Sequence, residues 1–150
     1  DLYRIAENAV DSLETTAEAM NVEISLIVSS TPMRGIPQDL YSIVYNLCDN
    51  AVKYNRPGGK VDVTITNGPR EIRLSVKDSG IGIPEESRER IFERFYRVDK
   101  SRSKKAGGTG LGLSIVKHAA LTHRAKIELK SKVGEGSEFI VIFPKERDNY

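Results

Sequence analysis

The sequence predicts an α+β fold, a two-layer sandwich in which a mixed, mostly antiparallel sheet is covered on one face by helices. Apolar residues recur at three-and-four spacing in some segments, which indicates amphipathic helices, and alternate with polar residues in others, which indicates half-buried strands. The segments follow the order helix, strand, helix, hairpin, helices, hairpin, which differs from the strand–helix alternation of a doubly wound sheet. With 150 residues the chain can form one substantial core, so we predict a single domain over residues 1–150.

The first elements are two helices that flank a strand. Apolar residues at helical spacing over residues 2–20 predict the first helix, and the alternation over residues 22–28 predicts the strand. Thr31-Pro32 ends this strand, and residues 33–36 are interpreted as a small edge strand. Pro37 opens the second helix, because the N–H that proline lacks would be unpaired at the first helical position.

The remaining elements are two hairpins and two helices. We expect, in order, strands at 61–65 and 72–76, helices at about 85–95 and 111–123, and strands at 127–131 and 139–143. Asn67-Gly68 suits the turn of the first hairpin, since both residues tolerate the backbone conformation that hairpin turns need.

Composition excludes several classes of protein. The formal net charge of +2 is too small to indicate a general nucleic-acid or membrane binder, and we expect no nucleic-acid partner. The sequence has no apolar run of the roughly 20 residues that a membrane span requires. Its single cysteine, Cys48, fits a reducing compartment. The chain starts at Asp1 without an initiator methionine, and we expect it to be a fragment of a longer protein.

A glycine-rich stretch, GGTGLGL at residues 107–113, precedes the helix expected from Leu111. Four glycines in six residues contribute nothing to a core, but they leave N–H groups accessible at the start of a helix. Such a helix start, with its positive dipole end, is suited to phosphate. The spacing matches neither a P-loop nor a dinucleotide fingerprint. The interpretation is a nucleotide-phosphate loop, and the alternative is a flexible loop.

Two further groups of polar residues suggest chemistry. Asn46, Asn50 and Lys53 share one face of the second helix, where amide oxygens suit Mg²⁺ and an ammonium suits phosphate. A solvated helix face is the alternative. Asp78 ends a strand and is followed by two glycines, so its carboxylate can accept from an exocyclic amine while the backbone turns around a ring. The alternative here is an ordinary turn.

Taken together, these stretches resemble the N, G1, F and G2 boxes of sensor histidine kinases. The stretches are NLCDNAVKY (46–54), DSGIG (78–82), FERFYR (92–97) and GTGLGL (108–113), in that order. GEGS at 134–137 is similar to the terminal G-x-G-[ST] element of the same family. The resemblance covers nearly the whole chain and implies the catalytic and ATP-binding domain of such a kinase, with the Bergerat fold shared with gyrase, mismatch-repair and heat-shock-chaperone ATPases.

The resemblance also implies roles for residues. Asn50 would bind Mg²⁺, Asp78 would bind the adenine amino group, and Phe92 would anchor the lid together with Phe95. The implied nucleotide-binding set is Asn46, Asn50, Lys53, Tyr54, Asp78, Gly80, Gly82, Ile83, Phe95, Gly108, Thr109, Gly110, Leu111, Gly112 and Leu113. The implied catalytic set is Asn46, Lys53 and Arg97.

The resemblance implies transfer of phosphate rather than hydrolysis. Related ATPases usually carry a glutamate where this chain has Asn46, and an asparagine cannot act as a general base. The chain would bind Mg-ATP and donate the γ-phosphate to a histidine on a separate dimerisation and phosphoacceptor domain, for onward transfer to a response regulator receiver domain. His118 and His123 are not followed by an acid, so we expect no self-phosphorylation of this fragment. The alternatives are a degenerate nucleotide-gated interaction module and a hydrolytic ATPase.

Three expectations concern context and loops. The parent protein would be a homodimer with this domain on the cytoplasmic side, as in the many relatives that cross the plasma membrane. His123-Arg124-Ala125 replaces the His-Gly-Gly that the family often has, which puts the shape of that loop in question. The basic segment with Lys100, Arg102, Lys104 and Lys105 is either a solvated loop or a contributor to triphosphate binding.

Overall fold

The protein is described by a computed structural model over residues 1–96 and 111–145. Five strands form one sheet in the order β1-β2-β3-β5-β4. They are β1 (Glu23–Ile27), β2 (Lys60–Asn67), β3 (Glu71–Asp78), β4 (Lys126–Lys132) and β5 (Gly136–Pro144). The β1–β2 pair is parallel, and the pairs β2–β3, β3–β5 and β4–β5 are antiparallel. The predicted mixed, mostly antiparallel sheet is confirmed.

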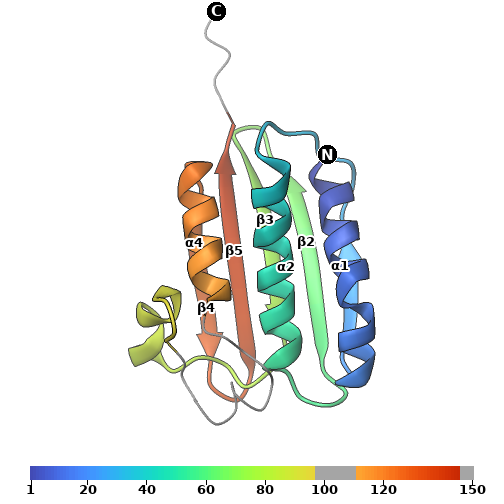
Figure 1. The fold of residues 1–150 in the computed structure, drawn as a ribbon, viewed down its shortest axis with the longest axis vertical. Coiled ribbons are helices and arrows are strands. Elements are labelled where there is room, and N and C mark those ends of the chain that lie inside the picture. Colours follow the sequence, from blue (N-terminus) through green and yellow to red (C-terminus); the bar gives the residue numbers. More distant parts are fainter. Residues whose placement is uncertain (97–110, 146–150) are drawn as a thin grey trace, which may run out of the picture.

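Helices cover one face of this sheet (Figure 1). They are α1 (Leu2–Ala19), α2 (Pro37–Lys53) and α4 (Gly112–Thr122). Each helix lies where the sequence predicts it, and α2 begins with its proline in the first turn. In the described part of the chain, no helix combines the length and the apolar character that a bilayer crossing requires.

The core lies between α2 and the middle strands. The apolar residues of β2 and β3 alternate along each strand and are buried against the helices, as Val63 and Leu74 are, whereas the residues between them, such as Asp62, carry polar groups. This alternation is what one covered and one open face require. Cys48 is fully buried in α2, and burial raises the pKa of its thiol to about 12. It therefore packs as a small apolar residue and not as a reactive thiolate.

Two sequence-based predictions of secondary structure are wrong. Residues 33–36 form no strand, because the chain here crosses from the end of β1 to the start of α2 (Figure 1). The Ile36 N–H donates to Nε2 of His123 at 2.9 Å instead of to a strand.

The helix expected at 85–95 is two short 3₁₀ helices, Glu85–Ser87 and Arg90–Phe92. Packing onto the sheet outweighs helical continuity in this segment. Ile91 is buried, and the Phe92 ring lies edge-on to Phe139 at a centroid distance of 6.3 Å. Phe95 has a φ of 65°, a left-handed conformation that a regular helix does not contain.

The loop after α4 keeps a tight turn without the glycines of the family pattern. Arg124 adopts the left-handed conformation, with a φ of 56°. Both ring nitrogens of His123 form hydrogen bonds. Nδ1 lies 2.8 Å from the carbonyl oxygen of Ala119 in α4, and Nε2 accepts the N–H of Ile36 just before α2. Nδ1 therefore carries the proton and donates. The imidazole thus joins the end of α4 to the start of α2.

Candidate functional site

The ends of the elements that carry the predicted motifs, among the described residues, lie at one end of the covered face. There α2 and β3 end, α4 begins, and β4 turns into β5 (Figure 1). Motifs that are separated along the sequence are therefore neighbours in the fold. A Cβ added to Gly112, in the first turn of α4, would lie 3.1 Å from Oδ1 of Asn46 in α2. The N and G2 stretches meet at this point.

Asp78 is the acidic residue at the centre of the site. It ends β3, and its Oδ1 accepts from the Gly80 N–H at 2.9 Å and from the Ser137 N–H at 3.2 Å. Within residues 1–96 and 111–145, no donor is hydrogen-bonded to its Oδ2. Burial raises the pKa of the Asp78 carboxyl, and the two backbone N–H bonds lower it by less. One carboxylate oxygen is thus fixed by the protein, and the other remains available to a ligand.

The raised pKa of Asp78 predicts a particular dependence of stability on pH. Its folded pKa lies above its ordinary value of 3.8, so between these two values the folded protein binds more protons than the unfolded chain. The contribution of Asp78 to the free energy of unfolding therefore falls as pH rises from about 3.8 through the folded pKa. We expect the wild type to lose stability relative to Asp78→Asn over this range, in urea unfolding at a series of pH values. A wild type that gains on the variant as pH rises there contradicts the shift.

Gly80 and Gly82 permit close packing of the backbone. The atom that would lie closest to an added Cβ is in each case a backbone atom of this protein. A Cβ on Gly80 would lie 2.4 Å from the Tyr54 carbonyl oxygen, and one on Gly82 would lie 2.3 Å from that of Lys132. The Ile83 N–H donates to Oγ of Ser131 at 2.8 Å. Tyr54 caps the end of α2, and its carbonyl accepts the Ile81 N–H at 3.2 Å. The turn after Asp78 is held from both sides.

Asn46 and Asn50 lie one turn apart on the half-buried face of α2. The Asn46 Nδ2 donates to the Ser42 carbonyl at 2.8 Å, which identifies the amide's other end, Oδ1, as the acceptor beside Gly112. Lys53 forms an ion pair with Asp49, Nζ to Oδ2 at 3.0 Å. The side chain that was predicted to contact phosphate is therefore held by a carboxylate within its own helix.

The start of α4 has the properties of an anion site. Leu111 is the N-cap residue and its side chain makes no capping bond, and Gly112 and Leu113 follow in the first turn. The first N–H groups of a helix have no acceptor within the helix, and they lie at its positive dipole end. Arg97, Gly108, Thr109 and Gly110 lie outside the described residues. Phe95 is 69% exposed, so of the two aromatic anchors only Phe92 is packed on the sheet.

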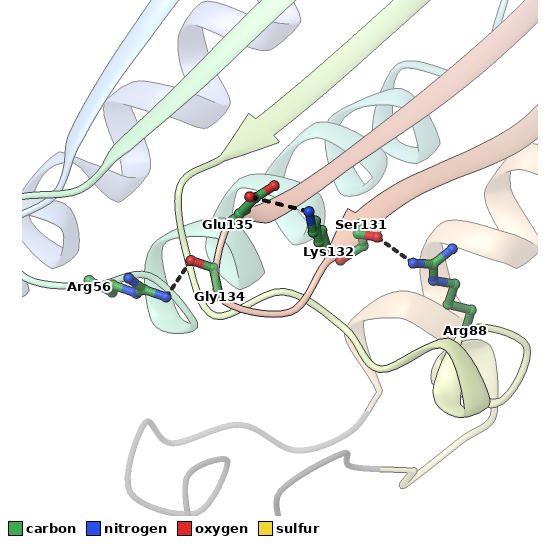
Figure 2. A network of polar contacts seen from close by, with 6 residues as sticks. All are labelled: Arg56, Arg88, Ser131, Lys132, Gly134 and Glu135. Atoms are coloured by element: carbon green, nitrogen blue, oxygen red, sulfur yellow. Dashed lines mark hydrogen bonds and ion pairs between the residues drawn. The ribbon is translucent and has the colours of Figure 1, made fainter.

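No sequence pattern indicates the network of polar contacts around the turn between β4 and β5, which Figure 2 shows. Ser131 Oγ lies 2.8 Å from Ser137 Oγ and 3.1 Å from the Gly136 carbonyl oxygen. Arg88 donates to the Ser131 carbonyl, and Arg56 donates to the Gly134 carbonyl at 2.7 Å. The G-x-G-S stretch at 134–137 was the one available signal, and it pointed to the turn and not to the arginines.

Comparison with known proteins gives a consistent result. The family model of histidine kinase-, DNA gyrase B- and HSP90-like ATPases matches residues 35–147. The sensor histidine kinase RppB of Synechocystis sp. is 42% identical over 130 residues, which are 85% of this chain and 29% of RppB.

Solved structures agree with this match. The mycobacterial sensor histidine kinase MprB superposes with a TM-score of 0.86 at 29% identity, covering 96% of this chain and 95% of that one. Full-length ShkA in complex with AMPPNP gives a TM-score of 0.79 at 30% identity, covering 96% of this chain and 30% of ShkA. The chain therefore spans about three tenths of the length of RppB and of ShkA.

Proposed function

We propose a function from the premise that the chain belongs to the histidine kinase-, DNA gyrase B- and HSP90-like ATPase family and is the ATP-binding catalytic domain of a sensor histidine kinase. In this proposal the domain binds Mg-ATP and transfers its γ-phosphoryl group to a histidine on a separate domain. The observation that carries the proposal is the half-buried Asp78 carboxylate, whose Oδ1 accepts two backbone N–H groups. It lies at the end of the sheet where Asn46 and the start of α4 also meet.

In this proposal Asp78 selects adenine. Its Oδ1 is occupied by two backbone N–H groups, so Oδ2 is the acceptor for the exocyclic amine of the base. Guanine presents a carbonyl oxygen at the equivalent position, which a carboxylate repels. The turn from Gly80 to Ile83 would form the wall of the base pocket.

The phosphates would lie between α2 and the start of α4. Asn46 and Asn50 offer amide oxygens there, and such hard ligands suit Mg²⁺, which neutralises phosphate charge when it is bound. In the part of the chain that the structure describes, no group of three or more His, Cys, Asp or Glu side chains could hold a metal ion. Magnesium would therefore depend on Asn50 together with phosphate oxygens and water. The N–H groups of the first turn of α4 would bind phosphate oxygens.

The direct test is calorimetric titration of the chain with Mg-ADP and with Mg-GDP. We expect binding of ADP with a Kd at least about tenfold below that of GDP, because one charged hydrogen bond is worth about 1.5–3 kcal/mol. A folded protein that binds neither nucleotide, or that binds both equally, contradicts the proposed adenine site.

A second prediction separates transfer from hydrolysis. Asn46 cannot deprotonate water, so we expect the purified chain neither to hydrolyse ATP nor to incorporate labelled phosphate. Adding the dimerisation and phosphoacceptor domain of the parent kinase in trans should produce an acid-labile phosphohistidine on that domain. Its phosphate would then pass to the receiver domain of a response regulator.

The Asp78→Asn variant, assayed at an ATP concentration near the wild-type Kd, is the control for contaminating enzymes, because its weaker nucleotide binding lowers any turnover that comes from this site and leaves turnover by a contaminant unchanged. Turnover of many ATP per minute that the variant abolishes would instead indicate a hydrolytic ATPase.

A further inference from the structure

Two arginines from different elements bind the β4–β5 turn, residues 132–136, and the end of β4 just before it. Arg56 follows α2, and its Nη2 donates to the Gly134 carbonyl at 2.7 Å. Arg88 follows the first 3₁₀ helix, and its Nη2 donates to the Ser131 carbonyl at the end of β4. Figure 2 shows the two side chains converging on this turn. Hydrogen bonds from a charged donor are stronger than neutral ones, and of these two the Arg88 bond is part-buried whereas the Arg56 bond is exposed to solvent.

The same turn is in close contact with the backbone around Asp78. The Gly134 N–H donates to the Ile81 carbonyl at 2.8 Å. A Cβ on Gly136 would lie 2.0 Å from the Asp78 carbonyl oxygen. Ser137 follows directly and supplies one of the two N–H groups that hold Oδ1 of Asp78. Ser137 is also paired with Asp78 in the β3–β5 ladder, so the ladder and the adjoining turn together place this donor at the carboxylate.

Arg88 is tied to the Asp78 surroundings by a second route. The residue whose carbonyl it binds, Ser131, also accepts the Ile83 N–H and contacts the Ser137 hydroxyl through Oγ. The Nε of Arg88 is buried and has no hydrogen-bond partner among the described residues. Burying a polar atom without a partner costs free energy. The hydrogen bond from Nη2 to the Ser131 carbonyl and the packing of the side chain must offset this cost.

We propose that Arg56 and Arg88 are positioning residues that fix the orientation of the Asp78 carboxylate through the β4–β5 turn, and so set how strictly the site selects adenine. This inference rests on the proposed function. Neither arginine needs to touch the nucleotide. Without them the Ser137 N–H moves away from Oδ1 of Asp78, and the carboxylate can rotate. The affinity for a base that carries an amino group then exceeds the affinity for a base that carries a carbonyl oxygen by a smaller factor.

The test measures discrimination, which loss of folded protein alone does not change. Mg-ADP and Mg-IDP differ in carrying an amino group or a carbonyl oxygen at the position that Asp78 would bind. Their Kd values are measured by calorimetry for the wild type, Arg56→Gln and Arg88→Met. The matched control is Arg73→Gln, which removes an exposed arginine paired with Glu71 at 2.8 Å on the open face of the sheet.

We expect the ratio of the IDP Kd to the ADP Kd to fall by about threefold or more in Arg56→Gln and Arg88→Met, and to stay unchanged in Arg73→Gln. A wild-type ratio well above one that neither variant lowers overturns the inference and leaves the proposed function standing. A wild-type ratio of one shows that Asp78 does not read the base, which removes the proposed adenine site and this inference together. Hydrogen exchange of the Ser137 amide, faster in both variants than in Arg73→Gln, is the independent check.

Discussion

Replacing Asp78 with asparagine is expected to raise the Kd for Mg-ADP by about tenfold to a hundredfold. The side chain keeps nearly the same shape, and its Oδ1 still accepts the Gly80 and Ser137 N–H groups. The amide nitrogen then takes the place of Oδ2, so an N–H of the side chain faces an N–H of the adenine amino group and no hydrogen bond forms. Isothermal titration at neutral pH measures the change.

The orientation of the asparagine predicts a second effect. Mg-IDP carries an acceptor where ADP has its amine, so its Kd should fall in Asp78→Asn while that of ADP rises. Asp62→Asn is the matched control, because Asp62 lies on the neighbouring strand β2 with its side chain on the polar, uncovered face. Equal affinity of Asp78→Asn and the wild type for ADP contradicts the assigned role.

Gly136→Ala is expected to lower the free energy of unfolding by about 3 kcal/mol or more, a large part of the roughly 5–15 kcal/mol that holds a domain folded. Its φ is 120°, and the added Cβ would lie 2.0 Å from the Asp78 carbonyl oxygen and 3.1 Å from the Gly80 nitrogen. All of these atoms belong to the backbone, so a side-chain rotation cannot relieve the overlap. Urea unfolding followed by circular dichroism measures the loss.

Gly58→Ala is the control for this substitution. Gly58 also has a positive φ, 83°, but nothing lies within 4 Å of its added Cβ. Its loss should be limited to the conformational strain of about 1–2 kcal/mol. If the two variants are equally stable, backbone crowding beside Asp78 contributes nothing.

The elements that could be predicted from the sequence are those whose pattern is local. The apolar stripe of α2 and the alternation in β2 are periodic patterns within one short segment of sequence, so both elements could be located correctly. The 3₁₀ helices at Glu85–Ser87 and Arg90–Phe92 were missed because contacts with distant strands determine them. An isolated segment with this composition has no feature that distinguishes the two outcomes.

The same reasoning applies to the site. Asp78 was selected from the sequence because a strand end followed by glycines is a local pattern, and in the structure its Oδ1 accepts two backbone N–H groups. Arg56 and Arg88 bind carbonyl groups that lie 78 and 43 residues away in the sequence. Any arginine could make such a bond, and only the fold shows which ones do.

The position of β5 in the sheet has a consequence for synthesis on the ribosome. The strand that comes last in the sequence lies inside the sheet between β3 and β4, and β4 pairs only with it among the described strands. Before residue 144 has left the exit tunnel, the nascent chain can pair only β1, β2 and β3. Long-range pairing of this kind is slow and leaves apolar surface exposed meanwhile. Co-translational folding of this segment is therefore expected to finish only after β5 has emerged.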